Sequence, residues 1–432
     1  MSGRSVAPAK RLRGTIAVPG DKSISHRAAI LNALAEGEAV VENFLAGADC
    51  LSTLSVLRAL GIESSLDESG GTPSLRVHGN GLAGLREAGD VLDCGNSGTT
   101  MRLMCGVLAG QRAHSVLTGD ASLRTRPMLR IVAPLREMGA GIDGRDGGRY
   151  APLAVRASAL HGIRYRLPVA SAQVKSAILL AGLFAEGETV VEEPEPTRDH
   201  TERMLAAMGA AIGREGPAVR LAPGKSLAPL SMRVPNDISA AAFWMVAAAV
   251  HPDAELHLTG VGVNPTRSGV IDALREMGAD VSVEEERTVA GEPVADIVVR
   301  SSELRGIEIG GDMIPRLVDE LPALAVAAAF ARGTTVIRDA AELAVKESDR
   351  IASTVNELSA LGVKISPRED GMIVEGGTGI AGGDARSYGD HRLAMALAIA
   401  GLTSREGVRV DEAECVSVSY PTFWEHLASM SG

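Results

Sequence analysis

The chain repeats one short pattern six times, and this repetition limits the folds that are open to it. Each copy has an apolar, alanine-rich helix, a turn with a charged or small residue and Gly or Pro, and a short β-branched strand. The copies read ILNALAEGEAVVENF, LMCGVLAGQRAHSVLTG, ILLAGLFAEGETVVEEP, FWMVAAAVHPDAELHLTG, LAVAAAFARGTTVIRDA and ALAIAGLTSREGVRVDEA. Because one unit cannot bury its apolar face alone, the pattern predicts stacked units of alternating helix and strand, an α/β fold.

A second helix that ends in glycine follows most copies, as in LRALGIES and LREMGAGID. Glycine is favoured just beyond a helix because it adopts a left-handed conformation without strain. The sixth unit falls at the end of the chain, where HLASMSG stops before its strand. We expect RLRGTIAV, at residues 11–18, to supply that strand. The glycines are Gly61, Gly139, Gly209, Gly278 and Gly362.

Two related phrases, VPGD at residues 18–21 and VPND at residues 234–237, divide the six units into three and three. We interpret them as two crossings between similar domains, where Pro fixes φ and Gly or Asn accepts an unusual φ. Residues 21–234 form one domain, and residues 1–20 plus 235–432 form the other, closed by the N-terminal strand. The crossings serve as hinges beside a ligand cleft, or they are only interdomain turns.

Composition excludes several classes of function. A net charge of -11 disfavours general attraction to nucleic acid or an anionic membrane, and 3% aromatic residues leave little for base stacking. The longest strongly apolar run, Ala240–Val250, is too short to span a bilayer. The four cysteines form no CxxC pair, so we expect neither a disulfide framework nor a zinc site, and a cytoplasmic location.

Residues that one copy of a repeat has and its siblings lack are candidates for function. The first crossing continues as KSISHR, whereas the second continues as ISAAAF, so Lys22 and Arg27 stand opposite Ile238 and Phe243. Cations at a helix start favour an anion site, together with Ser23. A P-loop is excluded because Asp21 precedes the lysine, and a solvated basic helix start is the alternative.

Further cations and small residues precede other apolar helices. LDCGNSGTTMRL holds Asn96 and Gly98, where small residues would let the backbone approach a ligand closely. SLRTRPMLR adds Arg126 among other arginines, each of which could instead form a surface salt bridge. PVASAQVKSAILL begins a third helix with Ser171, Ala172, Gln173 and Lys175, and EPTRDHTERM follows with Arg198.

The second half combines cations with carboxylates. Asp319 stands before a helix, where N-capping explains it better than chemistry does. Lys346 and Arg350 are four residues apart, so in a helix they would share a face and repel unless an anion sat between them. Glu347 lies beside them, and Arg392 opens the last apolar helix. Together with the first half, this indicates a small, multiply charged anionic substrate and acid–base chemistry without a metal or cofactor.

These motifs resemble those of the 5-enolpyruvylshikimate-3-phosphate synthase family across essentially the whole chain. GDKSISHR, GNSGT, RPM, SAQVKSA, RDHTE, NPTR, DELP, KESDR and DHR stand in the family's order, and SAQVK, RDHTE and NPTR resemble its bacterial class II branch. The resemblance implies a two-domain inside-out α/β barrel of six βαβαββ repeats, three per domain. It also implies transfer of the enolpyruvyl group of phosphoenolpyruvate to the 5-hydroxyl of shikimate 3-phosphate, with release of phosphate, and closure of the two lobes.

The resemblance also implies roles for individual residues. Asp319, Glu347 and Lys22 would be catalytic, with Asp319 taking the proton of the 5-hydroxyl and Glu347 protonating the methylene carbon of phosphoenolpyruvate. Shikimate 3-phosphate would meet Lys22, Ser23, Arg27, Ser171, Ala172, Gln173, Arg198, Asp319 and Lys346. Phosphoenolpyruvate would meet Lys22, Asn96, Gly98, Arg126, Gln173, Arg350 and Arg392. No cofactor, metal, nucleic acid or membrane is implied, and we expect a monomer.

Two departures from class I enzymes stand out: Val418 replaces a lysine, and Leu103 replaces a proline. Gly98 keeps the small residue associated with binding glyphosate, whereas the class II pattern indicates tolerance. The nearest alternative is the sister transferase that acts on UDP-N-acetylglucosamine, which has Lys-Asn at the lysine and usually a loop cysteine. Here Ser23 follows Lys22, and SLRTRPM lacks cysteine. A DNA clamp, a ring of repeats without catalytic activity, is a remote second alternative.

Overall fold

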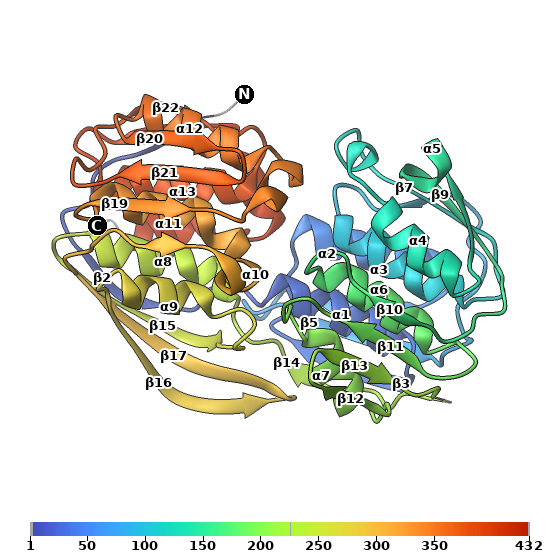
Figure 1. Ribbon diagram of the computed structural model, residues 1–432. Helices are drawn as coiled ribbons and strands as arrows, with labels where there is room; N and C mark the ends of the chain where they lie inside the picture. Colours follow the sequence, from blue (N-terminus) through green and yellow to red (C-terminus); the bar gives the residue numbers. More distant parts are fainter. Residues whose placement is uncertain (1–2, 225, 431–432) are drawn as a thin grey trace. The chain divides into compact units, whose positions relative to one another are not determined.

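The computed structural model describes residues 3–224 and 226–430, which form two compact units of mixed helix and strand (Figure 1). Unit 1 contains the described residues up to Pro19, then Pro235–Thr288 and those from Pro293 onward. Unit 2 contains Gly20–Val234 and the short segment Val289–Glu292. The division thus differs from the expected ranges at residue 20 and at this short segment.

Among the described residues, each unit has three sheets built to one plan. The strand that follows each apolar, alanine-rich helix pairs in parallel with one neighbouring strand and antiparallel with the other. The sheets of unit 2 are β14 (Met232–Arg233), β3 (Glu36–Glu42), β5 (Ser74–Asn80), β4 (Glu63–Asp67); β6 (Leu92–Asp93), β7 (Ser115–Thr118), β9 (Tyr150–Arg156), β8 (Gly141–Gly144); and β10 (Arg164–Arg166), β11 (Thr189–Glu192), β13 (Ala218–Leu221), β12 (Ile212–Glu215). The predicted α/β class is confirmed.

The sheets of unit 1 use the N-terminal residues twice. They are β16 (Asp280–Val289), β17 (Glu292–Arg300), β15 (Ala254–Gly262), β2 (Leu12–Ile16); β18 (Glu308–Ile309), β19 (Thr334–Ile337), β21 (Gly371–Glu375), β20 (Lys364–Arg368); and β1 (Arg4–Val6), β23 (Val408–Asp411), β22 (Gly383–Arg386). The expectation that RLRGTIAV completes the sixth unit is wrong. Strand β2 pairs with β15 of the fourth unit, and β1 supplies the sixth.

The apolar, alanine-rich helices form the interior of each unit. In unit 1, α8, α11 and α13 pack against one another, and nearly all their residues are buried. A helix that is apolar all round is stable only when it is buried on every side, so the sheets and the amphipathic helices take the outer positions. The helices are α1 (Lys22–Ala33), α2 (Ala48–Ala59), α3 (Gly98–Ala109), α4 (Leu129–Glu137), α5 (Arg145–Gly148), α6 (Ala172–Gly182) and α7 (His200–Ala207) in unit 2, and α8 (Ile238–Val250), α9 (Gly269–Glu276), α10 (Ile314–Leu317), α11 (Leu321–Phe330), α12 (Arg350–Ala360), α13 (His391–Thr403) and α14 (Phe423–Met430) in unit 1.

The ends of the helices agree with the sequence signals. The five glycines beyond the amphipathic helices all have positive φ, between 87° and 97°, as predicted. The aspartate shared by the two crossings caps an inner helix each time: Asp21 accepts from the Ile24 amide at 2.8 Å, and Asp237 accepts from the Ser239 amide at 2.8 Å. Ile238 is buried in the core of unit 1, so a lysine at this point is not part of the shared architecture.

The hairpin between β16 and β17 ends in the segment that belongs to unit 2. Within that unit, Nδ1 of His200 lies 2.8 Å from Oε1 of Glu292, and both side chains are almost completely buried. Arg203 donates from Nη1 to the Gly291 carbonyl at 2.8 Å. The segment is therefore tied to the start of α7.

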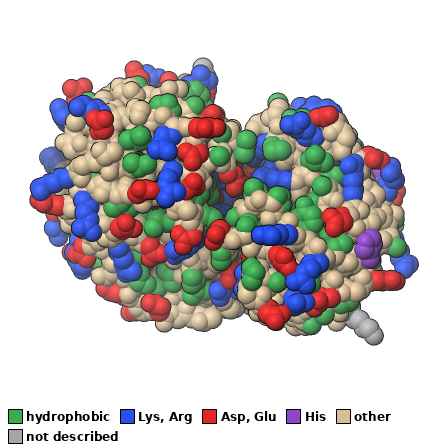
Figure 2. All heavy atoms as spheres, viewed as in Figure 1, with side chains coloured by type: hydrophobic (Ala, Val, Ile, Leu, Met, Phe, Trp, Pro, Cys, Tyr) green, Lys and Arg blue, Asp and Glu red, His purple; other side chains and the backbone are tan. Residues whose placement is uncertain are grey.

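Acidic and basic side chains are interspersed over the visible face of each unit (Figure 2). Within the described ranges, no helix has both the length and the apolar character needed to cross a membrane.

Candidate active site

The predicted site residues fall into two groups, one within each unit. Unit 2 holds Lys22, Ser23, Arg27, Asn96, Gly98, Arg126, Ser171, Ala172, Gln173 and Arg198. Unit 1 holds Asp319, Lys346, Glu347, Arg350 and Arg392.

Arg27 is the most deeply buried cation of the unit 2 group. Its guanidinium donates from Nε to Thr201 Oγ1 at 2.7 Å, from Nη2 to Ser176 Oγ at 2.8 Å and from Nη1 to the Ser23 carbonyl at 2.9 Å. Burial, together with the positive charge of Arg198, lowers the pKa of Arg27 to about 10, against the opposing charge of Glu202. Arg27 therefore remains charged near neutral pH, and an anion bound close to it would offset the cost of burying its charge.

The neighbouring helix starts hold the other members of this group. Ser171 is the N-cap residue of α6 and Ala172 its first residue, so backbone N–H groups are available there. Lys22 begins α1, and its Nζ lies 3.2 Å from Asp49 Oδ2, with both side chains partly exposed. Lys22 thus keeps some exposed side-chain surface although it is paired.

The GNSGT loop lies against two arginines. Arg126 donates from Nη2 to Asn96 Oδ1, and a Cβ added at Gly98 would lie 3.1 Å from Arg102 Nη1 and 3.6 Å from Arg126 Nη1. Gly98 therefore lets the backbone approach both guanidiniums closely. Arg102, in α3, donates to Gln173 Oε1 at 2.6 Å, which joins α3 to α6. Arg102 was not among the residues predicted from the sequence, although it stands within LDCGNSGTTMRL.

Unlike Lys22, Lys175 has no exposed side-chain surface. Its Nζ lies 2.9 Å from Glu193 Oε1 and 2.7 Å from Glu202 Oε1. Arg214 also pairs with both carboxylates. Burial raises the pKa of Glu202, and Lys175 opposes that rise. Lys175 thus belongs to an internal ion-pair cluster rather than to the accessible cations of the helix starts.

In unit 1 three cations surround Asp319. Its carboxylate lies 3.1 Å from Arg350 Nη1, 3.6 Å from Lys346 Nζ and 3.7 Å from Arg392 Nη2. Asp319 sits in a short 3-10 turn, Val318–Glu320, whose N-cap is Leu317, while Glu320 occupies the N-cap position of α11 without a capping hydrogen bond from its side chain. The expectation that Asp319 is an N-cap is therefore wrong, and its carboxylate is directed to a cluster of charges.

Arg350 joins the two predicted acid–base carboxylates. Nη1 contacts Asp319, and Nη2 donates to Glu347 Oε2 at 2.7 Å. Nε donates to Asp390 Oδ2 at 2.7 Å, and Asp390 also caps α13 by accepting from the Arg392 amide. Burial alone would lower the pKa of Arg350, but the carboxylates of Asp390, Glu347 and Asp319 raise it overall. Asp390 was missed because its partner lies in a different helix.

The expected helical spacing of Lys346 and Arg350 is wrong. A 3-10 helix, Ala341–Val345, ends just before Lys346, and α12 begins only at Arg350 after Asp349 has capped it. Asp349 accepts from the amides of Ile351 and Ala352, which fixes the helix start. The anion expected between the two cations is nevertheless present, because both contact Oδ1 of Asp319.

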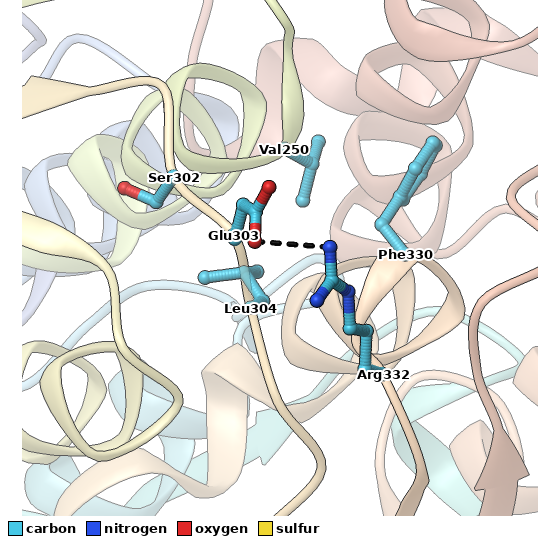
Figure 3. A pocket seen from close by; sticks show the side chains of 6 residues that line it. All are labelled: Val250, Ser302, Glu303, Leu304, Phe330 and Arg332. Atoms are coloured by element: carbon cyan, nitrogen blue, oxygen red, sulfur yellow. Dashed lines mark ion pairs between the residues drawn. The ribbon is translucent and has the colours of Figure 1, made fainter.

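A surface pocket of unit 1 lies apart from the predicted residues (Figure 3). It is lined by Val250 and Phe330, by Ser302, Leu304 and the Glu303–Arg332 ion pair at 3.0 Å. Both ion-pair side chains are largely exposed, and no residue assigned above lines this pocket.

The α/β units, the buried arginines and the two carboxylates that share a guanidinium are typical of an enzyme that acts on anionic substrates. Comparison with known proteins specifies the family. The chain belongs to the EPSP synthase (3-phosphoshikimate 1-carboxyvinyltransferase) family, whose model matches residues 6–427.

Individual relatives match over nearly their whole length. The chain is 59% identical over 426 residues to the 3-phosphoshikimate 1-carboxyvinyltransferase of Roseiflexus castenholzii, covering 98% of each chain. It is 55% identical over 430 residues to that of Herpetosiphon aurantiacus, covering 99% of each. A solved structure of EPSP synthase from Acinetobacter baumannii superposes with a TM-score of 0.88 at 48% identity, covering 99% of this chain and 98% of that one.

Proposed function

We propose that the chain transfers the enolpyruvyl group of phosphoenolpyruvate to the 5-hydroxyl of shikimate 3-phosphate and releases phosphate. The proposal rests on family membership together with one observation, the bridging of Asp319 and Glu347 by the buried guanidinium of Arg350. The guanidinium favours the ionised, proton-accepting form of both carboxylates, so Glu347 becomes a proton donor only after phosphoenolpyruvate has taken its place at Arg350.

Unit 2 supplies most of the proposed anion binding. Arg27, Lys22 and Arg198, with Ser23 and the start of α6 at Ser171, Ala172 and Gln173, would hold shikimate 3-phosphate. Guanidinium groups suit phosphate because their forked donors match two oxygens at once. The positive charge of Arg198 lowers the pKa of Arg27, and this repulsion supports the role because a dianion bound near both cations would relieve it.

Phosphoenolpyruvate would be held by the GNSGT loop and its arginines. Asn96, Gly98, Arg126 and Gln173 lie in one connected set in unit 2. Arg350 and Arg392 in unit 1 would contribute further contacts and would exchange part of their present pairing with carboxylates for the substrate. The proposed reaction therefore needs residues from both units.

The chemistry proceeds by addition and elimination. Protonated Glu347 gives its proton to the methylene carbon of phosphoenolpyruvate, and the 5-hydroxyl oxygen bonds to the neighbouring carbon while Asp319 accepts the hydroxyl proton. The tetrahedral intermediate then returns a proton from the new methyl group to Glu347. The carbon–oxygen bond to phosphate breaks, and the leaving phosphate takes up the proton held by Asp319. Lys22 and Lys346 stabilise the negative charge on the reacting groups.

We also propose that the two units are the two domains of an inside-out barrel. In each, three βαβαββ repeats would surround inner helices, as the common pairing plan of the sheets supports. We expect a cytoplasmic monomer that works without a cofactor. Activity that persists after exhaustive dialysis against a chelator would test the cofactor expectation. Light scattering after gel filtration would test the monomer.

Phosphate release by the purified protein tests the function directly. We expect release only when shikimate 3-phosphate and phosphoenolpyruvate are both present, with the enolpyruvyl product identified by mass spectrometry. Either substrate alone serves as the control. Release with UDP-N-acetylglucosamine in place of shikimate 3-phosphate would assign the chain to the sister activity instead.

A further inference from the structure

A chain of hydrogen bonds between side chains crosses the interior of unit 2. Nδ1 of His26 in α1 lies 2.7 Å from Thr53 Oγ1 in α2, which lies 2.6 Å from Thr100 Oγ1 in α3. Thr100 Oγ1 donates to Ser97 Oγ at 2.7 Å, and all four side chains are completely buried. Three helices are thus linked by buried polar side chains.

The direction of this chain follows from the number of protons. The single hydroxyl proton of Thr100 goes to an acceptor, either Ser97 Oγ or the Asp49 carbonyl at 3.4 Å. Thr53 must therefore donate to Thr100, which uses its own single proton. Nothing remains at Thr53 to donate to His26, so Nδ1 of the imidazole is the donor.

The other ring nitrogen agrees with this tautomer. Nε2 of His26 is buried and has no hydrogen-bond partner among the described residues. Burial lowers the pKa of His26 well below its usual value, and the charges of Lys22 and Arg27 lower it further. A cationic ring would leave a buried Nε2–H unsatisfied, which costs more than a bare nitrogen does.

The repeated architecture does not require an imidazole at this point. Aligning VPGD with VPND places His26 opposite Ala242 of α8, and Ala242 is also completely buried. A methyl group therefore suffices at the same point of an inner helix. The hydrogen-bond chain is a feature of the unit that carries the anion-binding groups.

Both ends of the hydrogen-bond chain lie next to the proposed anion-binding groups of unit 2. Ser97 is the N-cap residue of α3, accepts from the Thr100 amide at 3.1 Å and stands between Asn96 and Gly98. His26 lies one turn from Lys22 in α1. We propose that His26, protonated on Nδ1, is a positioning residue that fixes the GNSGT loop relative to the start of α1 and so sets the affinity for phosphoenolpyruvate. This rests on the proposed function for the role of the loop, but the tautomer does not.

Substitutions test the positioning role. His26→Asn keeps a donor near the Nδ1 position, whereas His26→Gln places its amide near the Nε2 position. We expect His26→Gln to raise KM for phosphoenolpyruvate on the order of tenfold, the effect of one lost buried hydrogen bond, with a much smaller change in KM for shikimate 3-phosphate. His26→Asn should stay near wild type. Thr53 lies in the middle of the hydrogen-bond chain. Thr53→Val should therefore behave like His26→Gln, and Thr53→Ser like His26→Asn.

A spectroscopic measurement on the unaltered protein keeps the inference testable if a variant does not fold. Long-range proton–nitrogen NMR of the histidines should show His26 with a proton on Nδ1 and none on Nε2. A His26 ring with its proton on Nε2 would overturn the inference. Equal KM values for phosphoenolpyruvate in Thr53→Val, His26→Gln and the wild-type protein would overturn it as well. If the wild-type protein releases no phosphate, the proposed function fails instead, and the NMR result still decides the direction of the chain.

Discussion

Replacing Lys175 by methionine should destabilise unit 2 strongly, because the lysine neutralises two buried carboxylates. Lys175 and Glu193 have no exposed side-chain surface, and the Glu202 side chain is only 13% exposed. Removing one partner of such a group costs about 3–5 kcal/mol. Arg214 still pairs with Glu193, so we expect the lower end, about 3 kcal/mol, which corresponds to a roughly hundredfold larger opening constant.

The assay must report on unit 2, and the two tryptophans, Trp244 and Trp424, both lie in unit 1. Hydrogen exchange measured by mass spectrometry on peptides of α6 (Ala172–Gly182) gives the opening free energy where the substitution acts. The matched control is Arg220→Met, whose pairs with Glu188 and Glu215 are exposed and should contribute little to stability.

A second change and the pH dependence test the electrostatic reasoning. Adding Glu202→Gln to Lys175→Met restores neutrality and should recover most of the loss. A carboxyl group whose folded-state pKa lies above its unfolded value stabilises the fold only when protonated, so that contribution is lost as pH rises through the folded pKa. The single variant should therefore gain stability on acidification. Equal exchange in Lys175→Met and Arg220→Met, or no recovery in the double variant, would refute the reasoning.

Other substitutions test the proposed chemistry. Asp319→Asn and Glu347→Gln should each lower kcat at least a hundredfold, in the range typical of acid–base residues, with smaller effects on binding; near-normal turnover would remove that residue from the role. Lys22→Ile, which copies Ile238 of the second crossing, should abolish turnover while circular dichroism and cooperative unfolding persist; loss of cooperativity would show the lysine to be structural. Asp390→Asn should raise KM for phosphoenolpyruvate, because Arg350 loses the carboxylate that orients it, and an unchanged KM would show that Glu347 and Asp319 suffice.

The repeat predicted the α/β class because it is a local signal, with helix and strand written into each copy. The glycines at the helix ends were predictable for the same reason, since φ depends on the residue itself. The N-terminal strands were misassigned because two short strands compete for two incomplete sheets. Neither strand carries a sequence feature that selects its partner.

Candidate site residues could be singled out from the sequence, but the contacts between them could not. Arginines and carboxylates near helix starts could be recognised as candidates from residue type alone. The pairing of Arg350 with Asp390, in contrast, depends on how α12 packs against α13. The sequence contains a signal against one helix through both Lys346 and Arg350. Asp349, directly before Arg350, is a good N-cap residue and so marks a helix start there. Lys175 was grouped with its accessible neighbours because burial is a tertiary property and leaves no mark on a short motif.

The hairpin segment Val289–Glu292 means that unit 2 is not encoded by one continuous stretch of the gene. A fragment cut at the two proline crossings would keep His200 but lose Glu292, and with it a buried partner at the start of α7. Exchange of one half of the chain between relatives therefore has to preserve a match between His200 and a loop from the other half. Recombination sites chosen from the internal repeat alone would separate the two.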